Sequence, residues 1–142
     1  MIPAVTSEAR QPRLHVVDDD AMWRYLVANA LRERGFAVEE FDGADSLLAA
    51  FDQPGPDGRP DMLLIDALMP GVSGFELCRR LAESGALRDT PVLMMTSLDD
   101  DTSISQAYES GATDFFIKST HWTLLAERIR QVPARQGTEH LE

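Results

Sequence analysis

The sequence has few of the residues that form covalent crosslinks or bind soft metal ions. It holds one cysteine, Cys78, and three histidines among its 142 residues. A single cysteine excludes an internal disulfide bond, and the scattered histidines lack the spacing of a thiolate or imidazole metal site. From its neighbours in the sequence, we predict that Cys78 is a small core residue.

Long apolar runs and basic residues are also scarce. No run approaches the roughly 20 apolar residues that a membrane span needs, and the N-terminus lacks the charged-then-apolar layout of a signal peptide. We therefore expect a cytoplasmic protein that has no membrane partner. The net charge of -11, from 13 Lys and Arg against 24 Asp and Glu, argues against direct nucleic acid binding, because nucleic acid backbones are bound through basic side chains.

The length and composition predict one globular domain. Apolar residues make up 44% and charged residues 26% of the chain, which is ordinary for a globular protein. A chain of 142 residues is long enough for a single substantial core. The two ends, residues 1–12 and 133–142, are expected to be tails or linker.

Five short apolar runs alternate with helical patterns. Four runs are almost continuously apolar, as in strands that are buried on both faces, whereas the run at 37–41 is more polar and suits the edge of a sheet. The alternation predicts a parallel sheet with helices on both faces. The runs are LHVV (14–17), AVEEF (37–41), MLLI (62–65), VLMM (92–95) and DFFI (114–117).

Five helices are predicted between and after these strands. In the first, the spacing of Trp23, Leu26, Val27, Ala30 and Leu31 indicates one apolar face. A loop rich in Pro and Gly, at 52–60, separates the second helix from the third strand. The other four helical segments are ADSLLAAF (44–51), GFELCRRLAES (74–84), DDDTSISQAYESG (99–111) and the segment 122–129.

Chemically active side chains follow the carboxyl ends of four predicted strands. In open parallel sheets, ligands bind outside these ends, where the strand order reverses, so we expect the side chains to meet at one edge. Asp61 and Asp114 precede their strands and are expected at the opposite edge. The residues at the carboxyl ends are Asp18 and Asp19 after the first strand, Asp66 after the third, Thr96 after the fourth and Lys118 after the fifth.

This set of side chains suits phosphoryl transfer. Asp18, Asp19 and Asp66 offer the oxygen ligands that Mg²⁺ prefers. Asp66 can then act as a nucleophile and form an aspartyl phosphate. The Thr96 hydroxyl and the Lys118 ammonium would hold the phosphoryl oxygens as charge spreads in the transition state.

Each of these residues also has a plain structural explanation. The acidic triplet 18–20 can be a solvated turn that caps the next helix, a role we assign to Asp20 in any case. Asp66 can be a turn residue, Thr96 a hydroxyl at a strand end, and Lys118 a solvated charge. Their equivalent positions at the ends of four strands make the combined functional interpretation the better one.

The chain resembles the receiver domain of two-component response regulators. The resemblance covers residues 13–131, which we take as the domain, and no single motif carries it alone. It implies a flavodoxin-like, doubly wound, five-stranded parallel α/β sheet of order 2-1-3-4-5 with five helices. The motifs are VVDDD (16–20), LLIDALMPGVSGFEL (63–77), PVLMMTS (91–97) and GATDFFIKS (111–119).

The resemblance also implies site residues and a cofactor. Asp66 would be the phosphoacceptor, with Thr96 and Lys118 binding the phosphoryl group. Phe115 would be an aromatic switch that follows the hydroxyl of Thr96 and, lacking a phenol, can switch only by burial. The domain would catalyse only its own phosphorylation and dephosphorylation, so it is not an enzyme in the usual sense. Mg²⁺, or Mn²⁺ in its place, would bind Asp18, Asp19, Asp66 and the backbone carbonyl of Leu68.

The implied partners are a histidine kinase or phosphotransfer protein and an output domain. We expect this chain to be part of a longer regulator with the output domain on its C-terminal side. The run at 111–132 is similar to receivers that precede diguanylate cyclase domains. The resemblance is also compatible with a homodimer.

The chain departs from the family pattern after the last strand. The family usually has Lys-Pro there with a cis peptide bond, whereas this chain has Lys118-Ser119. A cis bond before a residue other than proline costs about 2.5 to 4 kcal/mol, a strain that persists mainly at functional sites. Because Lys118 must point at the phosphoryl site, we predict a cis bond here. Ser73, where Asp is common, is expected to matter less.

Two rival functions follow from the same residues. A phosphatase of the haloacid dehalogenase type also uses Asp, Thr or Ser, Lys and Mg²⁺, but it needs a second Asp two residues after the nucleophile, where this chain has Leu68. A phosphorylation-independent interaction module would keep the fold and lose the acids or the lysine, yet all are present. The interaction module is the alternative that stays open.

Overall fold

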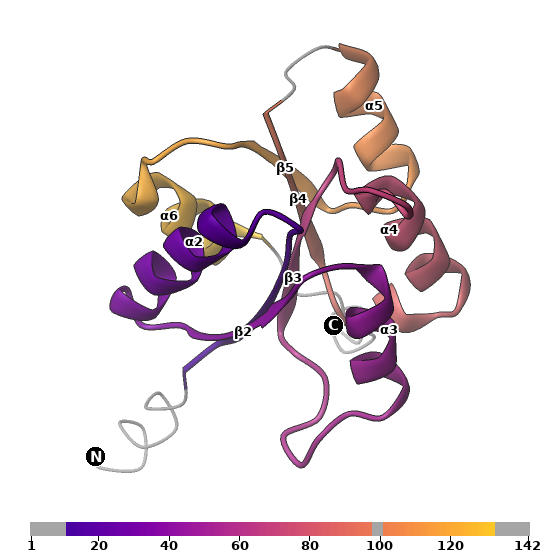
Figure 1. The fold of residues 1–142 in the computed structure, drawn as a ribbon, viewed down its shortest axis with the longest axis horizontal. Coiled ribbons are helices and arrows are strands. Elements are labelled where there is room, and N and C mark those ends of the chain that lie inside the picture. Colours follow the sequence, from indigo (N-terminus) through magenta and orange to yellow (C-terminus); the bar gives the residue numbers. More distant parts are fainter. Residues whose placement is uncertain (1–10, 98–100, 133–142) are drawn as a thin grey trace, which may run out of the picture.

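The protein is a single layered α/β domain around a five-stranded parallel sheet (Figure 1). The computed structural model describes residues 11–97 and 101–132. The strand order is β2-β1-β3-β4-β5, so the predicted order 2-1-3-4-5 is confirmed. The strands are β1 (Arg13–Val17), β2 (Ala37–Phe41), β3 (Met62–Asp66), β4 (Val92–Thr96) and β5 (Asp114–Ile117).

The helices cover both faces of the sheet. Helices α2 and α6 lie on one face, and α3, α4 and α5 lie on the other (Figure 1). A short 3-10 turn, η1 (Ala86–Arg88), follows α4 and was not predicted. The helices are α2 (Ala21–Glu33), α3 (Ala44–Asp52), α4 (Gly74–Glu83), α5 (Asp101–Glu109) and α6 (Trp122–Gln131).

Alternation along the strands divides the core into two apolar layers. Val16 and Leu64 pack beneath α2 and α6, whereas their neighbours Val17 and Ile65 pack beneath α3, α4 and α5. Successive side chains of a strand point to opposite faces, so a strand buried on both sides needs an apolar residue at every position. Strands β3 and β4 are buried along their whole length, and β2 at the edge is largely half-exposed. Cys78 is fully buried in the apolar layer beneath α3, α4 and α5, as predicted.

The first helix confirms one prediction and corrects another. Asp20 caps α2, since its carboxylate accepts hydrogen bonds from the backbone N–H groups of Met22 and Trp23 at 3.1 and 3.2 Å. Leu26, predicted for the apolar face, is instead 42% exposed, whereas Val27 and Leu31 are fully buried. The stripe that faces the sheet is narrower than the sequence spacing suggested, because β1 and the neighbouring α6 cover only one side of α2.

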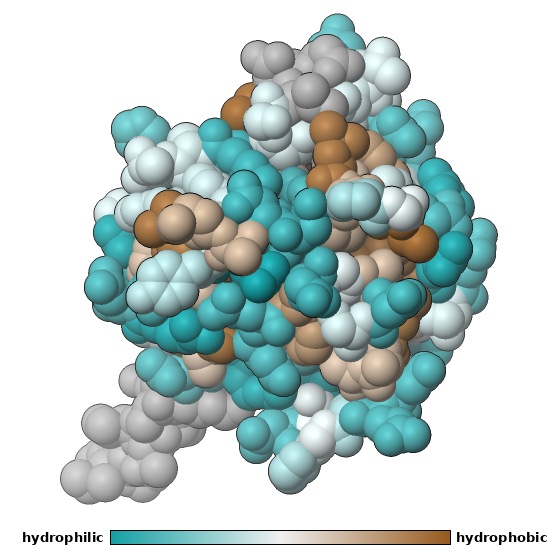
Figure 2. All heavy atoms as spheres, in the orientation of Figure 1, coloured by the Kyte–Doolittle hydropathy of each residue, from teal (hydrophilic) through white to brown (hydrophobic). Residues whose placement is uncertain are grey.

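The face of the protein drawn in Figure 2 is mainly hydrophilic. On the face drawn in Figure 2, apolar side chains form separate patches among polar ones. Among the helices of the described ranges, none has the length and apolar character to cross a membrane. The predicted tails lie almost wholly outside the described residues, as do positions 98–100, which include the first two residues of the predicted acidic helix start.

One glycine brings a helix against the end of the central strand. The backbone N–H of Gly74, the first residue of α4, donates a 2.9 Å hydrogen bond to the carbonyl of Ala67. A Cβ atom at Gly74 would overlap the carbonyl oxygen of Asp66 and would lie 2.8 Å from its carbonyl carbon. The approach therefore requires glycine, because backbone atoms cannot move aside as a flexible side chain can.

We expect Gly74→Ala to destabilise the protein by about 1 to 3 kcal/mol or more, the usual cost of forcing extra atoms into a packed region. Chemical denaturation of parent and variant would measure it. Gly43→Ala is the matched control, since Gly43 lies directly before helix α3 and a Cβ there would meet nothing within 4 Å. Equal free energies of unfolding for the parent and Gly74→Ala would contradict the close approach.

Candidate functional site

Four strands deliver the predicted side chains to one edge of the sheet. The parallel register places Val17 beside Ile65, Asp66 beside Met95 and Thr96 beside Ile117. Residues that end these strands, or directly follow them, therefore lie next to one another. The side chains in contact are those of Asp18, Asp19, Asp66 and Lys118, and Thr96 ends the neighbouring strand β4 at the same edge.

The two aspartates chosen as negative controls lie at the other edge. Asp61 precedes β3, and its carboxylate accepts a 2.7 Å hydrogen bond from the backbone N–H of Arg13, the first residue of β1. Asp114 begins β5 and pairs with Leu93 near the start of β4. Their position confirms the prediction that these two aspartates lie at the opposite edge of the sheet from Asp18, Asp19 and Asp66.

Three carboxylates form a compact acidic cluster. One carboxylate oxygen each from Asp18, Asp19 and Asp66 lies within 4.8 Å of the others. Asp18 is fully buried, Asp66 is 5% exposed and Asp19 is open to solvent. The carboxylate of Asp18 also accepts a 2.9 Å hydrogen bond from the backbone N–H of Asp20. Buried like charges repel one another strongly, so this cluster needs a compensating positive charge.

Lys118 supplies one such charge from the end of β5. Its ammonium lies 2.9 Å from a carboxylate oxygen of Asp18 and 3.0 Å from one of Asp66. Burial alone would lower the pKa of Lys118, but the hydrogen bonds and charges of these two aspartates outweigh burial and raise it above its ordinary value. Lys118 therefore stays protonated and bridges the two carboxylates.

The ammonium does not compensate the cluster fully. Burial, followed by the negative charge of Asp18, raises the pKa of Asp66 to about 6, and the hydrogen bond and charge of Lys118 lower it by less. Asp66 is thus held in a site where its ionised form is costly. A carboxylate in this state gains most from an additional cation.

The donor set of the cluster fits a hard divalent cation. Mg²⁺ binds through a few carboxylates together with water and phosphate oxygens, and the cluster offers three carboxylates, of which Asp19 faces solvent. The absence of sulfur and nitrogen donors from this trio disfavours soft metals. Leu68 lies two residues after Asp66 in the sequence, and this residue is 51% exposed.

The peptide bond after Lys118 corrects a sequence prediction. The described residues contain no cis peptide bond, so the predicted cis Lys118-Ser119 bond is wrong. The backbone N–H of Lys118 donates a 2.7 Å hydrogen bond to the carbonyl of Thr96, which continues the β4–β5 ladder to the end of the strand. The long lysine side chain then reaches Asp18 and Asp66 from a trans backbone, so no strained bond is needed.

Sequence reasoning missed Arg24, which holds the backbone at the cluster. Its guanidinium donates a 2.6 Å hydrogen bond to the carbonyl of Asp18, and its Nε lies 3.3 Å from the carboxylate of Glu40 on β2. Arg24 thereby ties α2 and β2 to the end of β1. The available signal was its position one helical turn after the acidic triplet, but its partner on β2 could not be identified from sequence.

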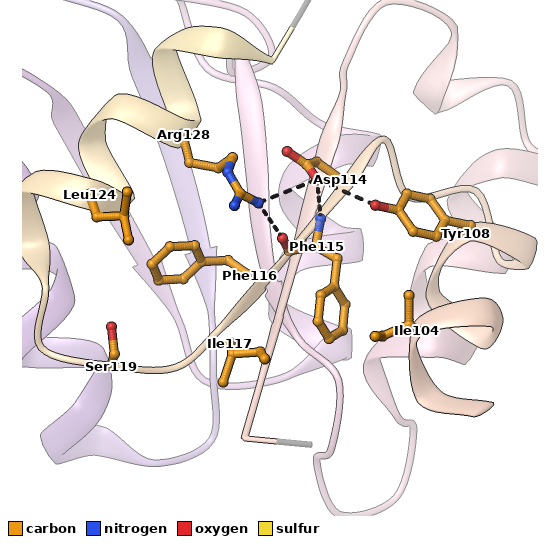
Figure 3. Close-up of a pocket in the computed structure, with 9 residues that line it drawn as sticks. All are labelled: Ile104, Tyr108, Asp114, Phe115, Phe116, Ile117, Ser119, Leu124 and Arg128. Atoms are coloured by element: carbon orange, nitrogen blue, oxygen red, sulfur yellow. Dashed lines mark hydrogen bonds and ion pairs between the residues drawn. The ribbon is translucent and has the colours of Figure 1, made fainter. Parts of the chain in front are cut away.

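Thr96 and Phe115 lie on the opposite side of the sheet from Lys118. Thr96 is 1% exposed, and Phe115 is 8% exposed and pairs with Met94, two residues before Thr96. Phe115 also lines a groove of about 560 Å³ along β5, between α5 and α6 (Figure 3). In Figure 3 the guanidinium of Arg128 lies across this groove and donates a 2.7 Å hydrogen bond to the carbonyl of Phe115.

The family model and the sequence relatives that match this chain are all response regulators. A family model described as the response regulator receiver domain matches residues 14–130. The chain is 33% identical over 129 residues to the transcriptional regulatory protein AfsQ1 of Streptomyces coelicolor, covering 90% of this chain and 54% of that protein. It is 37% identical over 122 residues to the response regulator PleD of Caulobacter vibrioides, covering 84% of this chain and 26% of PleD.

A solved structure that is similar in sequence also has the same fold. The structure of FixJ-N superposes with a TM-score of 0.75 at 32% identity, covering 94% of this chain and 98% of that one. The chain spans about half the length of the first relatives that it matches, at 54%, 43% and 52%.

The raised pKa of Asp66 predicts a stability effect with a defined sign. In the metal-free protein, ionising Asp66 costs the folded state free energy, because its pKa is about 6 in the fold against an ordinary 3.8. This cost is absent below pH 3.8 and complete above about pH 6. With a chelator present, Asp66→Asn should therefore stabilise the protein by about 1 to 3 kcal/mol at pH 8, and by less at pH 5.

Denaturant titrations at the two pH values would measure the effect. Asp57→Asn, an exposed aspartate in the loop before β3, is the control and should change stability by no more than about 0.5 kcal/mol at either pH. A loss of stability in Asp66→Asn at pH 8 would show that the site does not strain Asp66.

Proposed function

The chain belongs to the receiver domains of two-component response regulators, and from this membership we propose that Asp66 accepts a phosphoryl group from a histidine kinase or a phosphotransfer protein. The proposed domain covers residues 13–131. The observation that carries the proposal is the buried Asp66 carboxylate, which lies beside Asp18 and is bridged to it by the Lys118 ammonium. In this family, phosphorylation switches the domain between signalling states.

The reaction is a displacement at phosphorus. A carboxylate oxygen of Asp66 attacks, a new P–O bond forms, and the bond from phosphorus to the donor breaks, with its electron pair leaving on the donor. We propose that Mg²⁺, or Mn²⁺ in its place, is held by Asp18, Asp19, Asp66 and the backbone carbonyl of Leu68. When bound, it supplies positive charge to the carboxylates and to the phosphoryl oxygens.

Lys118 and Thr96 would bind the phosphoryl group from two sides. Lys118 already bridges Asp18 and Asp66, and its flexible side chain can follow the charge as it moves from the carboxylate to the phosphoryl oxygens. Thr96 ends the strand next to Asp66 and carries a hydroxyl that can donate to one of those oxygens. Groups placed before the reaction begins need little reorganisation in the transition state.

The proposed switch runs from Thr96 to the groove along β5. Phe115 lies on the same face of the sheet as Thr96 and beneath that groove. When Thr96 moves toward the phosphoryl group, the ring of Phe115 can occupy the space that it leaves. The ring lacks a hydroxyl group, so the change would be one of burial, and it would alter the shape of the groove that a partner contacts.

The proposed chemistry changes the domain itself, and the domain then controls an output domain or partner. We propose that it catalyses only its own phosphorylation and dephosphorylation, and that the full-length regulator carries an output domain on the C-terminal side. AfsQ1 is named a transcriptional regulatory protein, which supports an output that acts on DNA, while the run at 111–132 supports a diguanylate cyclase output. A homodimer is compatible with either.

The complete set of acids and lysine favours phosphorylation over the alternative interaction module. A module that needs no phosphate has no reason to keep Asp66 at a raised pKa beside Asp18. A phosphatase of the haloacid dehalogenase type would need a carboxylate at position 68, where the side chain is an exposed leucine.

Asp66→Asn is expected to abolish phosphoryl labelling. The amide cannot form a stable acyl phosphate, and Asp18 and Asp19 are proposed as ligands of Mg²⁺ rather than as phosphoacceptors. Incubation with acetyl phosphate and Mg²⁺, followed by intact mass measurement, should show one added phosphoryl group on the parent and none on the variant. Asp61→Asn, at the opposite edge, is the control and should label like the parent. Labelling of Asp66→Asn at the parental level would refute the assignment.

Mg²⁺ should stabilise the unphosphorylated protein by mass action. A cation that binds only the folded state raises the unfolding temperature as its concentration increases, and Asp19→Ala should remove most of this increase by deleting the exposed ligand. Differential scanning fluorimetry with 0 or excess Mg²⁺ measures it. Asp20→Asn keeps a side chain suited to capping α2 and should retain the Mg²⁺ response. An equal response in the parent and Asp19→Ala would contradict the proposed ligand set.

A further inference from the structure

Two tryptophans that the proposed function does not use lie beside its lysine. Trp23 is on α2, Trp122 begins α6, and their ring centroids are 5.4 Å apart with the rings tilted at 43°. The ammonium of Lys118 lies 5.2 Å from the centroid of the Trp23 ring. This distance is in the range of a cation–π interaction, for which tryptophan is the strongest partner.

The ammonium is therefore held on three sides. Asp18 and Asp66 contact it at 2.9 and 3.0 Å, and the Trp23 ring covers a third direction. The Lys118 side chain is only 19% exposed as a result. A lysine side chain has high rotamer entropy, and the Trp23 ring adds a third contact that restricts it.

The segment after Lys118 is held by local hydrogen bonds. The backbone N–H of His121 donates to the hydroxyl of Ser119 at 3.3 Å, and that of Trp122 donates to the carbonyl of Thr120 at 2.9 Å. These bonds shape the turn but do not aim the Lys118 side chain. The peptide bond after Lys118 is trans. The Trp23 ring is a contact that does restrict its direction.

The Trp23 ring makes its described contacts through its face rather than through its indole N–H. This N–H is buried and has no hydrogen-bond partner among the described residues. Buried tryptophans usually satisfy this group, and an unsatisfied one costs stability. The ring orientation instead presents its face to the ammonium and packs against Trp122, so the interaction gained is with Lys118.

We infer that Trp23, supported by Trp122, is a positioning residue that keeps the Lys118 ammonium directed at Asp66 before and during phosphoryl transfer. The inference rests on the proposed function of Asp66 and deepens it. Trp23 contacts no reacting atom and acts through Lys118. Because the two rings belong to different helices, the pair also links the packing of α2 and α6 to the position of the ammonium.

Labelling kinetics of three variants test this inference. Under saturating acetyl phosphate and Mg²⁺, Trp23→Leu should lower the maximal phosphorylation rate about threefold to tenfold, the size expected for loss of a partly desolvated cation–π contact. Trp23→Phe keeps a ring and should retain more of the rate. The half-saturating concentrations of phosphodonor and Mg²⁺ should stay within about twofold of parent, because the carboxylates are unchanged.

Phe36→Leu is the matched control. Phe36 packs in the same apolar layer, and the guanidinium of Arg130 lies 4.8 Å from its ring centroid, so this variant also loses an aromatic ring and a cation–π contact. Phe36 precedes β2 and lines a cavity at the opposite edge of the sheet, with Asp61 and Pro91. Its loss should change stability while leaving the labelling rate within about twofold of the parent.

The outcomes separate this inference from the function on which it rests. A parent that does not label refutes the proposed function. A parent that labels, together with a Trp23→Leu rate within twofold of the parent or equal to that of Trp23→Phe, overturns the positioning role alone. An equal rate loss in Phe36→Leu also overturns it, because the effect would then follow general packing.

A second measurement covers the case in which Trp23→Leu does not fold. In a Trp122→Phe background, Trp23 is the one remaining tryptophan, and its fluorescence should change when Mg²⁺ binds and competes with the ammonium for Asp18. Adding Lys118→Met should remove most of that change. A Mg²⁺-dependent change of the same size without Lys118 would overturn the inference.

Discussion

The repulsion between two buried carboxylates governs this molecule. Asp18 directly follows β1, and Asp66 ends the neighbouring strand β3. The two carboxylates share one ammonium, that of Lys118, which is not enough to keep Asp66 at its ordinary pKa. The fold therefore holds a site whose repulsion a bound divalent cation would relieve. A protein domain is only marginally stable. The free-energy cost of ionising Asp66 beside Asp18 therefore persists only because the surrounding structure holds the two carboxylates together.

The surrounding fold holds Asp18 and Asp66 close together through contacts made largely by backbone atoms. The parallel register sets Asp66 beside β4, Gly74 brings α4 against the Asp66 carbonyl, and Arg24 fixes the Asp18 carbonyl from α2. None of these contacts depends on the charge state of the site. The carboxylates can therefore change their partners, from ammonium to metal or phosphoryl group, while the strand ends stay in place.

The site connects the two faces of the sheet. Lys118 and the tryptophan pair lie on the face covered by α2 and α6, while Thr96 and Phe115 lie on the face covered by α4 and α5. A phosphoryl group on Asp66 would contact residues from both faces at once. One chemical event could then alter both the packing of α2 against α6 and the shape of the groove along β5.

The sequence by itself determined the sheet, its edge strand and which acidic and basic side chains meet at the carboxyl edge of the sheet. These features depend on the apolar pattern within each segment and on position along a strand, and both are local, which is why Asp66 and Thr96 could be separated from Asp61. Only the tertiary structure decided which groups pair across the chain. Lys118 and Asp18 are 100 residues apart, and the trans bond after Lys118, the exposure of Leu26 and the place of Trp23 all depend on how α2 and α6 pack over the sheet. Such contacts are set by three-dimensional packing between distant segments, and no local pattern encodes them.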